Sequence, residues 1–337
     1  MNKYNPLWGD KPYYSVNEYC KHRYHEKLYK IAIDAGFTCP NRDGTLDTRG
    51  CIFCSAGGSG DFAVKMYSEV DTEQVHTTSY VAASAKSVTE QIQEGLSLFR
   101  GKRVGTRFIA YFQAYTNTYA PVEHLRALYT QALSHPDIAG ISIATRPDCL
   151  PEECLDLLAD LQAEFPDKFI WVELGLQTMH ESTAKFIRRG YPLSVFEKAM
   201  DELTKRNIQV IIHVILGLPS ETVDMQYATI SYLNQLHPFG IKLQLLHILK
   251  GTDLADYYAD SMGEFKSLDK QEYLDLLIGC MERLSPDIVI HRVTGDGPKD
   301  LLIAPTWSLN KRDVLNSLHK QMREQNSYQG KLYHPEA

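Results

Sequence analysis

The stretch Ser194-Val-Phe-Glu-Lys-Ala-Met-Asp-Glu-Leu-Thr-Lys-Arg-Asn-Ile-Gln-Val-Ile-Ile-His-Val-Ile215 decides the fold class of this chain. It opens with Ser194 and Glu197, the spacing of a capping box at the start of a helix. It ends in Ile208–Ile215, which is almost continuously apolar, as in a strand that is buried on both faces. A helix followed by such a strand predicts a parallel sheet covered by helices.

The same alternation runs through most of the chain. Ser87 and Glu90 repeat the capping-box spacing, and Pro121 and Pro151 suit the first turn of a helix. Six strand–helix units predict an α/β fold with a partial or complete parallel (β/α) barrel of the kind that supports many enzymes. A doubly wound open sheet is the alternative. The expected strands are Leu28–Ile33, Arg107–Phe112, Ile138–Ala144, Phe169–Leu174, Ile208–Ile215 and Ile241–Ile248.

Two terminal regions fall outside the alternation. Residues 1–27 are rich in tyrosine, tryptophan and basic residues. Residues 251–337 hold a helical stretch (Lys270–Leu284), a further apolar run (Asp287–Val293) and a polar, basic tail. We therefore expect residues 28–250 to form the barrel core, with an N-terminal extension before it and a C-terminal extension packed on it.

The composition is that of an ordinary globular protein, with 44% hydrophobic and 23% charged residues. No stretch approaches the roughly 18 unbroken apolar residues of a membrane span, and the first residues lack the apolar core of a secretory signal. We therefore expect a cytoplasmic protein without a membrane partner. The net charge of −7 argues against a general nucleic-acid coat protein, but it leaves room for a local basic face.

Three of the seven cysteines share the loop after the first expected strand, which reads Cys39-Pro-Asn-Arg-Asp-Gly-Thr-Leu-Asp-Thr-Arg-Gly-Cys51-Ile-Phe-Cys54. In a cytosolic chain, such cysteines indicate metal binding or catalysis before disulfides. Three thiolates can hold three irons of a [4Fe–4S] cluster, which leaves the fourth iron for an exogenous ligand. In an enzyme, that ligand would be the amino and carboxylate groups of S-adenosylmethionine (SAM). Phe53 would then lie over the adenine.

Other cysteine chemistry remains open at this point. Cys149 and Cys154 could complete a structural zinc site with the C-x-x-C pair. A thioredoxin-type redox pair would place the C-x-x-C at a helix N-terminus. Taken one by one, the cysteines outside the loop are better explained as small buried residues: Cys20, Cys149, Cys154 and Cys280.

The cysteine loop resembles the radical-SAM superfamily, through Asp34-Ala-Gly-Phe-Thr-Cys39-Pro-Asn-Arg-Asp-Gly-Thr45 and Cys51-Ile-Phe-Cys54. More narrowly, it is similar to a bacterial family related to the catalytic subunit of the Elongator complex. Further segments match that narrower pattern over roughly residues 25–310. They are Ile143-Ala-Thr-Arg-Pro-Asp148, Val172-Glu-Leu-Gly-Leu-Gln-Thr178, His213-Val-Ile-Leu-Gly-Leu-Pro-Ser-Glu-Thr222 and Lys250-Gly-Thr-Asp253.

The resemblance implies roles for particular residues. Cys39, Cys51 and Cys54 match the cluster ligands. Gln177 and Arg189 match positions that contact SAM in related enzymes. Gln177 would reach the ribose, and the planar fork of Arg189 would pair with the methionine carboxylate.

The chain departs from the family pattern after the second and third strands. Many relatives carry Gly-Gly-Glu where this chain has Phe112-Gln-Ala-Tyr-Thr-Asn-Thr118, so Gln113 and Asn117 would accept hydrogen bonds from the SAM amino group. Ala144 replaces the glutamate of the Elongator pattern. Arg146, from the same segment, joins the expected cofactor-binding residues.

The resemblance also implies the reaction. A reduced cluster would cleave SAM to methionine and a 5′-deoxyadenosyl radical, with flavodoxin or ferredoxin as the electron donor. Elongator-type relatives act on the wobble uridine of tRNA, which makes tRNA the expected substrate, in an aminomethyl-type 2-thiouridine pathway. Two alternatives stay open: a radical-SAM enzyme acting on a small metabolite or tetrapyrrole precursor, and a non-enzymatic, metal-stabilised nucleic-acid-binding protein. No catalytic residue is assigned.

Basic and aromatic residues offer contacts for RNA. Phosphates would meet the cations of the N-terminal segment, of residues 100–107 and of the tail, while exposed tyrosines would stack on unpaired bases. The residues concerned are Lys21, Arg23, Arg100, Lys102, Arg103, Arg107, Lys311 and Arg312, with Tyr13, Tyr14 and Tyr19.

Overall fold

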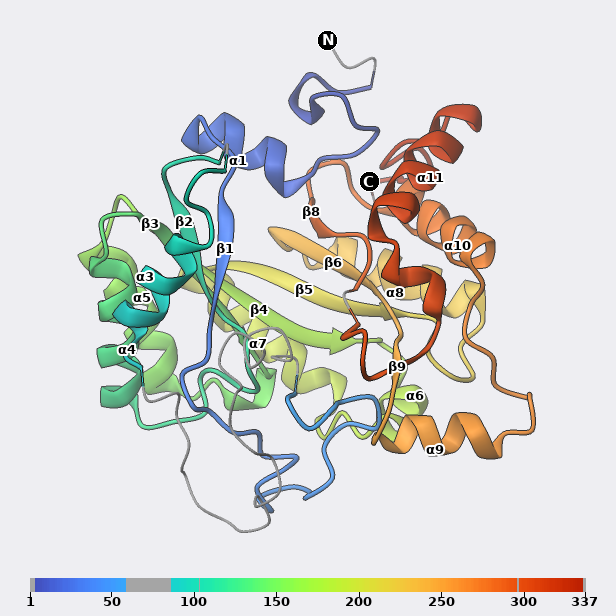
Figure 1. Ribbon diagram of the computed structural model, residues 1–337, viewed down its shortest axis with the longest axis horizontal. Coiled ribbons are helices and arrows are strands. Elements are labelled where there is room, and N and C mark those ends of the chain that lie inside the picture. Colours follow the sequence, from blue (N-terminus) through green and yellow to red (C-terminus); the bar gives the residue numbers. More distant parts are fainter. Residues whose placement is uncertain (1–3, 59–85, 103, 296, 336–337) are drawn as a thin grey trace. The chain divides into compact units, whose positions relative to one another are not determined.

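The computed structural model describes residues 4–58, 86–102, 104–295 and 297–335, and it confirms the alternation of strands and helices (Figure 1). The strands are β1 (Tyr29–Ile33), β2 (Phe108–Phe112), β3 (Ile138–Thr145), β4 (Phe169–Gln177), β5 (Gln209–Leu216), β6 (Gly240–Leu245), β7 (Ile248–Leu249), β8 (Val289–Arg292) and β9 (Leu302–Ala304). The α-helices are α1 (Val16–Tyr24), α3 (Val88–Ser97), α4 (Val122–Ser134), α5 (Glu152–Glu164), α6 (Glu181–Phe186), α7 (Leu193–Lys205), α8 (Val223–Gln235), α9 (Asp253–Asp260), α10 (Lys270–Arg283) and α11 (Lys311–Glu324). Short 3₁₀ helices are η1 (Pro6–Trp8), η2 (Pro147–Cys149) and η3 (Thr306–Leu309).

Seven strands form one parallel sheet in the order β1-β2-β3-β4-β5-β6-β8, and β7 pairs with β9 in a separate antiparallel ribbon. A doubly wound sheet reverses its strand order at a switch point, and this order contains no reversal. The fold is therefore the predicted α/β type, a partial (β/α) barrel whose strand order runs from β1 to β8 without closing.

Two local predictions differ from the structure. The seventh strand of the sheet, β8, comes from the run Asp287–Val293, which the sequence pattern left in the C-terminal extension. Helix α7 begins at Leu193, so Ser194 lies inside its first turn and not before it as a cap. By contrast, the capping box at Ser87 and Glu90 is confirmed.

The described residues divide into two compact units. The first comprises Met1–His25, Leu176–Leu193 and Ile211–Ala337, and the second comprises Glu26–Gly175 and Ser194–Val210. The first unit holds most of β5 together with β6–β9. The second unit holds β1–β3 and most of β4, together with the cysteine loop. That residues 28–250 form the barrel core stays a prediction.

In the second unit, helices α3, α4 and α5 cover one face of the strands (Figure 1). Phe112 of β2 meets Tyr129 of α4 with ring centroids 5.2 Å apart. Helix α3 approaches β1 so closely that a Cβ at Gly95 would lie 2.3 Å from the Ile31 side chain. Because strand residues alternate between faces, the neighbours of Ile31 and Phe112 in sequence point to the opposite side of the sheet.

That opposite face carries a buried carboxylate, Glu173 of β4. Its side chain is fully buried and accepts hydrogen bonds from Lys30 Nζ at 2.7 Å, Tyr111 Oη at 3.0 Å and Ser142 Oγ at 2.6 Å. The donors come from β1, β2 and β3, so one carboxylate links four strands. The Lys30 ammonium also lies 4.1 Å from the centre of the Tyr111 ring.

In the first unit, the N-terminal segment and the C-terminal tail both meet β8. The Ile290 amide donates to Tyr14 O at 2.8 Å, and Gln329 Nε2 donates to Ile288 O at 2.8 Å. Tyr13 is 3% exposed and hydrogen-bonds His319 of α11 at 3.2 Å. It is therefore a packing residue, and the expected stacking of a base on Tyr13 is wrong because its ring is covered.

We predict that Glu173→Ala destabilises the protein by about 3–5 kcal/mol, because it leaves the Lys30 charge without its partner in a largely buried setting. The double variant Lys30→Met/Glu173→Leu should lose less, since it removes both charges together. Denaturant unfolding of the three proteins measures the difference. A Glu173→Ala protein as stable as wild type would contradict the structural role of the carboxylate.

Candidate functional site

The three cysteines of the loop after β1 are free thiols, each partly exposed. The amides of Arg42 and Asp43 donate to Cys39 O at 2.7 and 3.1 Å, which turns the chain back directly after the first cysteine. Cys54 N donates to Cys51 O at 3.0 Å, which closes a turn between the other two. The backbone thus keeps the three cysteines within one compact loop.

Charged groups surround these thiols. Burial raises the pKa of Cys51 to about 12, and the neighbouring Cys54 adds to this, while Arg146 and a hydrogen bond from Asn41 act in the opposite direction. A thiol with this pKa is protonated at neutral pH, so a metal must displace its proton on binding. Cys39 and Cys54 both act electrostatically on Cys51, so the structure brings the three predicted ligands into one neighbourhood.

The donor set, three thiols in one loop, has the chemistry of an iron–sulfur site. Within the described residues, no group of three or more His, Cys, Asp or Glu side chains is arranged to hold one metal ion. In a [4Fe–4S] cubane each thiolate binds a different iron, so its ligands stand further apart than those around one zinc ion. The cysteines outside the loop, Cys20, Cys149, Cys154 and Cys280, are all buried.

The segment after β2 folds against the cysteine loop. The Thr116 amide donates to Thr38 O at 3.2 Å, and Tyr115, with a left-handed φ of 59°, donates its hydroxyl to Ala56 O at 2.5 Å. Asn117 is fully buried, and its Nδ2 donates to Ala144 O at 2.8 Å. Its Oδ1 has no hydrogen-bond partner among the described residues. A buried acceptor without a donor is costly, and it suits a ligand that brings an N–H group.

Arg146, at the end of β3, does not present an open fork. It is 8% exposed and forms a two-pronged ion pair with Asp148, at 2.9 and 2.7 Å. Its positive charge nevertheless acts on the loop, since it lowers the pKa of Cys51 against the effect of burial. Gln113 and Phe53 are partly exposed, and their expected contacts with SAM stay predictions.

In the first unit, Gln177 ends β4 in an unusual conformation. Its φ is 68°, in the left-handed region that non-glycine residues rarely adopt, and its buried Oε1 has no hydrogen-bond partner in the described part of the chain. Strain and an unpaired acceptor in one residue are typical of a functional position. Both features fit the expected hydrogen bond to a ligand hydroxyl.

Arg189 holds the backbone on both sides of Gln177. It is 1% exposed, and its Nη1 donates to Leu176 O at 3.1 Å and to Thr178 O at 2.7 Å. Its Nε donates to Tyr191 O at 3.1 Å, and its Nη2 lies 3.4 Å from Glu181. Most of its donors thus serve the chain itself, while the expected pairing with the SAM carboxylate stays a prediction.

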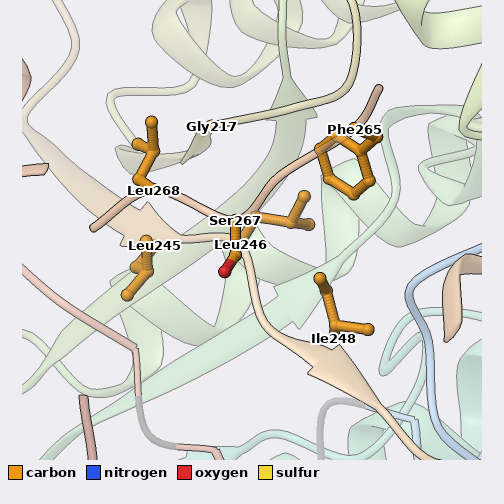
Figure 2. A pocket seen from close by; sticks show the side chains of 7 residues that line it. All are labelled: Gly217, Leu245, Leu246, Ile248, Phe265, Ser267 and Leu268. Carbon is orange, nitrogen blue, oxygen red and sulfur yellow. The ribbon is translucent and has the colours of Figure 1, made fainter. Parts of the chain in front are cut away.

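An apolar pocket lies where β5 and β6 end, in the first unit (Figure 2). It encloses about 180 Å³ of empty space, part of which is open to solvent. It is lined by Gly217, Leu245, Leu246, Ile248, Phe265, Ser267 and Leu268.

The chain matches two known protein families. A family described as the Radical SAM superfamily matches residues 48–233, and one described as the Radical_SAM C-terminal domain matches residues 238–324. The chain belongs to the radical SAM superfamily. Proteins of this superfamily are SAM-dependent enzymes that use a [4Fe–4S] cluster. Within the described residues, no helix of this radical SAM protein is both long and apolar enough to cross a membrane.

Its relatives support the narrower resemblance. "Uncharacterized protein YtqA" of Bacillus subtilis is 42% identical over 324 residues, which are 96% of this chain and 94% of the relative. "Elongator complex protein 3" of Danio rerio is 23% identical over 317 residues, 87% of this chain and 56% of the relative. "tRNA uridine(34) acetyltransferase" of Methanocaldococcus infernus is 23% identical over 167 residues, 49% of this chain and 30% of the relative. The expected relation to the Elongator catalytic subunit is confirmed.

A solved structure supports the fold. Methanocaldococcus infernus Elp3 lacking its N-terminus superposes with a TM-score of 0.64 at 14% identity, over 90% of this chain and 64% of that one. At this identity the likeness concerns the fold, which is the radical SAM partial (β/α) barrel.

Some site residues carried no separate signal in the sequence. Asn41 and Arg42 stood in the cysteine motif without assigned roles, yet both side chains contact the loop that holds the thiols. Thr178 and Glu221, hydrogen-bonded at 2.5 Å, support the turn after Gln177. Only the position of Asn41 and Arg42 between Cys39 and Cys51 hinted at their use.

We predict that Arg189→Ala destabilises the protein by about 3–5 kcal/mol, because it leaves the carbonyls beside Gln177 without donors in a buried place. Arg188→Ala is the matched control. It removes the same charge one residue away, but Arg188 pairs with Asp253, whose side chain is 43% exposed, so a smaller loss is expected. Thermal and denaturant unfolding of both variants checks this, and equal losses would refute the role of Arg189.

Proposed function

We propose that this protein binds a [4Fe–4S] cluster through Cys39, Cys51 and Cys54 and uses it with SAM to modify the wobble uridine of tRNA. The observation that carries the proposal is the loop of three free thiols, set beside two arginines, in a chain of the radical SAM superfamily. When bound and reduced, the cluster supplies the electron that cleaves SAM to methionine and a 5′-deoxyadenosyl radical.

The chain's own residues bind and orient SAM in this proposal. Asn117 accepts a hydrogen bond from the SAM amino group through Oδ1, which is buried and has no partner in the described residues. Gln177 accepts from a ribose hydroxyl through Oε1 for the same reason. Phe53 stands between two of the proposed ligands in sequence, where its ring would cover the adenine.

The tRNA substrate rests on relatives and on surface charge. One relative is named for its action on tRNA uridine 34, and the chain covers 30% of it. Lys21, Arg23, Lys311 and Arg312 are exposed, and Lys21 is paired with Glu18 at 2.7 Å. Arg107 is engaged by Glu26 at 2.9 Å, and Arg103 lies outside the described residues. A flavodoxin or ferredoxin in the cytoplasm would supply the electron.

We predict that Cys39→Ala, Cys51→Ala or Cys54→Ala abolishes the iron–sulfur absorbance after anaerobic reconstitution, because each variant removes a ligand. Cys20→Ala and Cys280→Ala should keep the absorbance, since both thiols are buried and neither belongs to the cysteine loop in the sequence. The assay is iron and sulfide content with SAM-dependent release of 5′-deoxyadenosine. Full SAM cleavage by a Cys54→Ala protein would refute the ligand set, and colourless, stably bound zinc in wild type would favour a binding protein.

We predict that tRNA binding falls steeply with salt, by roughly a thousandfold between 50 and 200 mM if six phosphates are contacted. Lys21→Glu/Arg23→Glu should weaken binding and leave substrate-free SAM cleavage unchanged, because both side chains are exposed and distant in sequence from the cysteine loop. Lys266→Glu/Lys320→Glu makes the same change of net charge at residues without an expected role.

Filter binding of unmodified tRNA and mass spectrometry of nucleosides from a deletion strain check the substrate. Normal wobble uridines together with salt-insensitive or absent tRNA binding would reject tRNA. The reaction would then be assigned to a small metabolite or tetrapyrrole precursor.

A further inference from the structure

Arg42 bridges the two ends of the cysteine loop. Its Nη2 donates to Cys54 O at 2.8 Å and to Ser55 O at 2.5 Å. The side chain reaches them by crossing Gly50, where a Cβ would lie 2.9 Å from Arg42 Nε. Gly50 also has a φ of 78°, so both its conformation and its missing side chain let the bridge form.

The charge of Arg42 lies beside the thiol-bearing residues. Its Nη2 is 2.8 Å from the carbonyl oxygen of Cys54, which carries one of the three thiols. In the described ranges of the chain, no carboxylate forms an ion pair with Arg42, whose hydrogen bonds go to carbonyl oxygens. Arg146, the other cation near the loop, is paired with Asp148 at 2.7 Å. Arg42 is thus the arginine there whose charge is not balanced by a carboxylate.

Asn41 donates a hydrogen bond to another cysteine of the loop, Cys51. It is 2% exposed, and its Nδ2 donates to Cys51 Sγ at 3.5 Å. The Gly50 amide donates to Asn41 O at 2.7 Å, which fixes the residue in the loop. Two adjacent residues therefore bring a hydrogen bond and a positive charge to the loop that holds the three thiols.

These groups matter most for a reduced cluster. A cubane held by three thiolates carries net negative charge, and reduction by one electron from an external donor adds to it. A nearby cation and N–H···S hydrogen bonds stabilise the more negative state more strongly, which raises the reduction potential. Low local dielectric inside the loop strengthens the effect.

We propose that Arg42 is a positioning residue that raises the reduction potential of the cluster held by Cys39, Cys51 and Cys54, with Asn41 supporting it through Cys51. The inference rests on the proposed function, since it requires a cluster at these thiols. In this proposal, residues of the chain, and not only bound SAM, set how readily the cluster accepts an electron.

The test compares Arg42→Gln with Arg49→Gln in the full-length, reconstituted protein without SAM or tRNA. Arg49 belongs to the same loop, but its side chain is 63% exposed and its Nε lies 3.8 Å from Asp47, so the control removes one charge that faces solvent. Iron and sulfide content are measured first. The midpoint potential is then titrated by electron paramagnetic resonance.

Arg42→Gln should shift the midpoint potential to more negative values by at least about 59 mV, a tenfold change in the constant for one-electron reduction. Arg49→Gln should match wild type. If wild type forms no cluster, the proposed function fails and the inference with it. If wild type and Arg42→Gln both hold the cluster at equal potentials, the inference alone is overturned.

If Arg42→Gln does not retain iron, the reduction potential of Arg42→Lys is measured in its place. This variant keeps the positive charge and gives up the two-pronged bridge. A cluster with a potential near that of wild type supports the electrostatic role. A clearly lowered potential, or no cluster in either variant, overturns it, because Arg42 would then only hold the loop together.

Discussion

Parallel pairing of β1, β2 and β3 is the constraint on which the cysteine site depends. The register joins Ile33 to Phe112 and Phe112 to Ile143, so the three strands end at the same edge of the sheet. Segments that are far apart in the chain therefore meet there: the cysteine loop, the turn that carries Asn117 and the start of the Arg146 segment. Backbone hydrogen bonds from Thr116 to Thr38 and from Asn117 to Ala144 complete the contact.

Buried charge is balanced in three different ways in the described residues. Glu173 receives three side-chain donors, Arg146 meets one carboxylate with two hydrogen bonds, and Arg189 donates to backbone carbonyls and lies 3.4 Å from the Glu181 carboxylate. Each solution offsets the cost of removing an ion from water. Arg42 differs, because it donates to two carbonyl oxygens and no carboxylate of the described residues forms an ion pair with it. An anionic cluster would supply the opposite charge, which is the physical basis for proposing that Arg42 acts in reduction.

Two buried side-chain acceptors, unlike these charged groups, have no hydrogen-bond partner among the described residues. Asn117 Oδ1 and Gln177 Oε1 are buried without donors in the described residues, and Gln177 is also held in a left-handed conformation. Both features cost stability, and neither improves the packing of the chain. Arg189 maintains the strained turn by binding the carbonyls before and after Gln177. The two side chains that we propose to bind SAM therefore lower the stability of the folded protein.

The sequence by itself determined the strand–helix alternation and the location of the cysteine loop, because buried parallel strands are continuously apolar and the ligands lie close together in the chain. It missed β8 as a member of the sheet, since four residues within a terminal extension carry no periodic signal. The tertiary structure decided what Arg42, Arg146 and Arg189 contact. A basic residue looks the same in a sequence whether it meets a carboxylate, a carbonyl or a sulfur. The choice depends on backbone turns, such as the one at Gly50, that bring distant atoms within hydrogen-bonding distance.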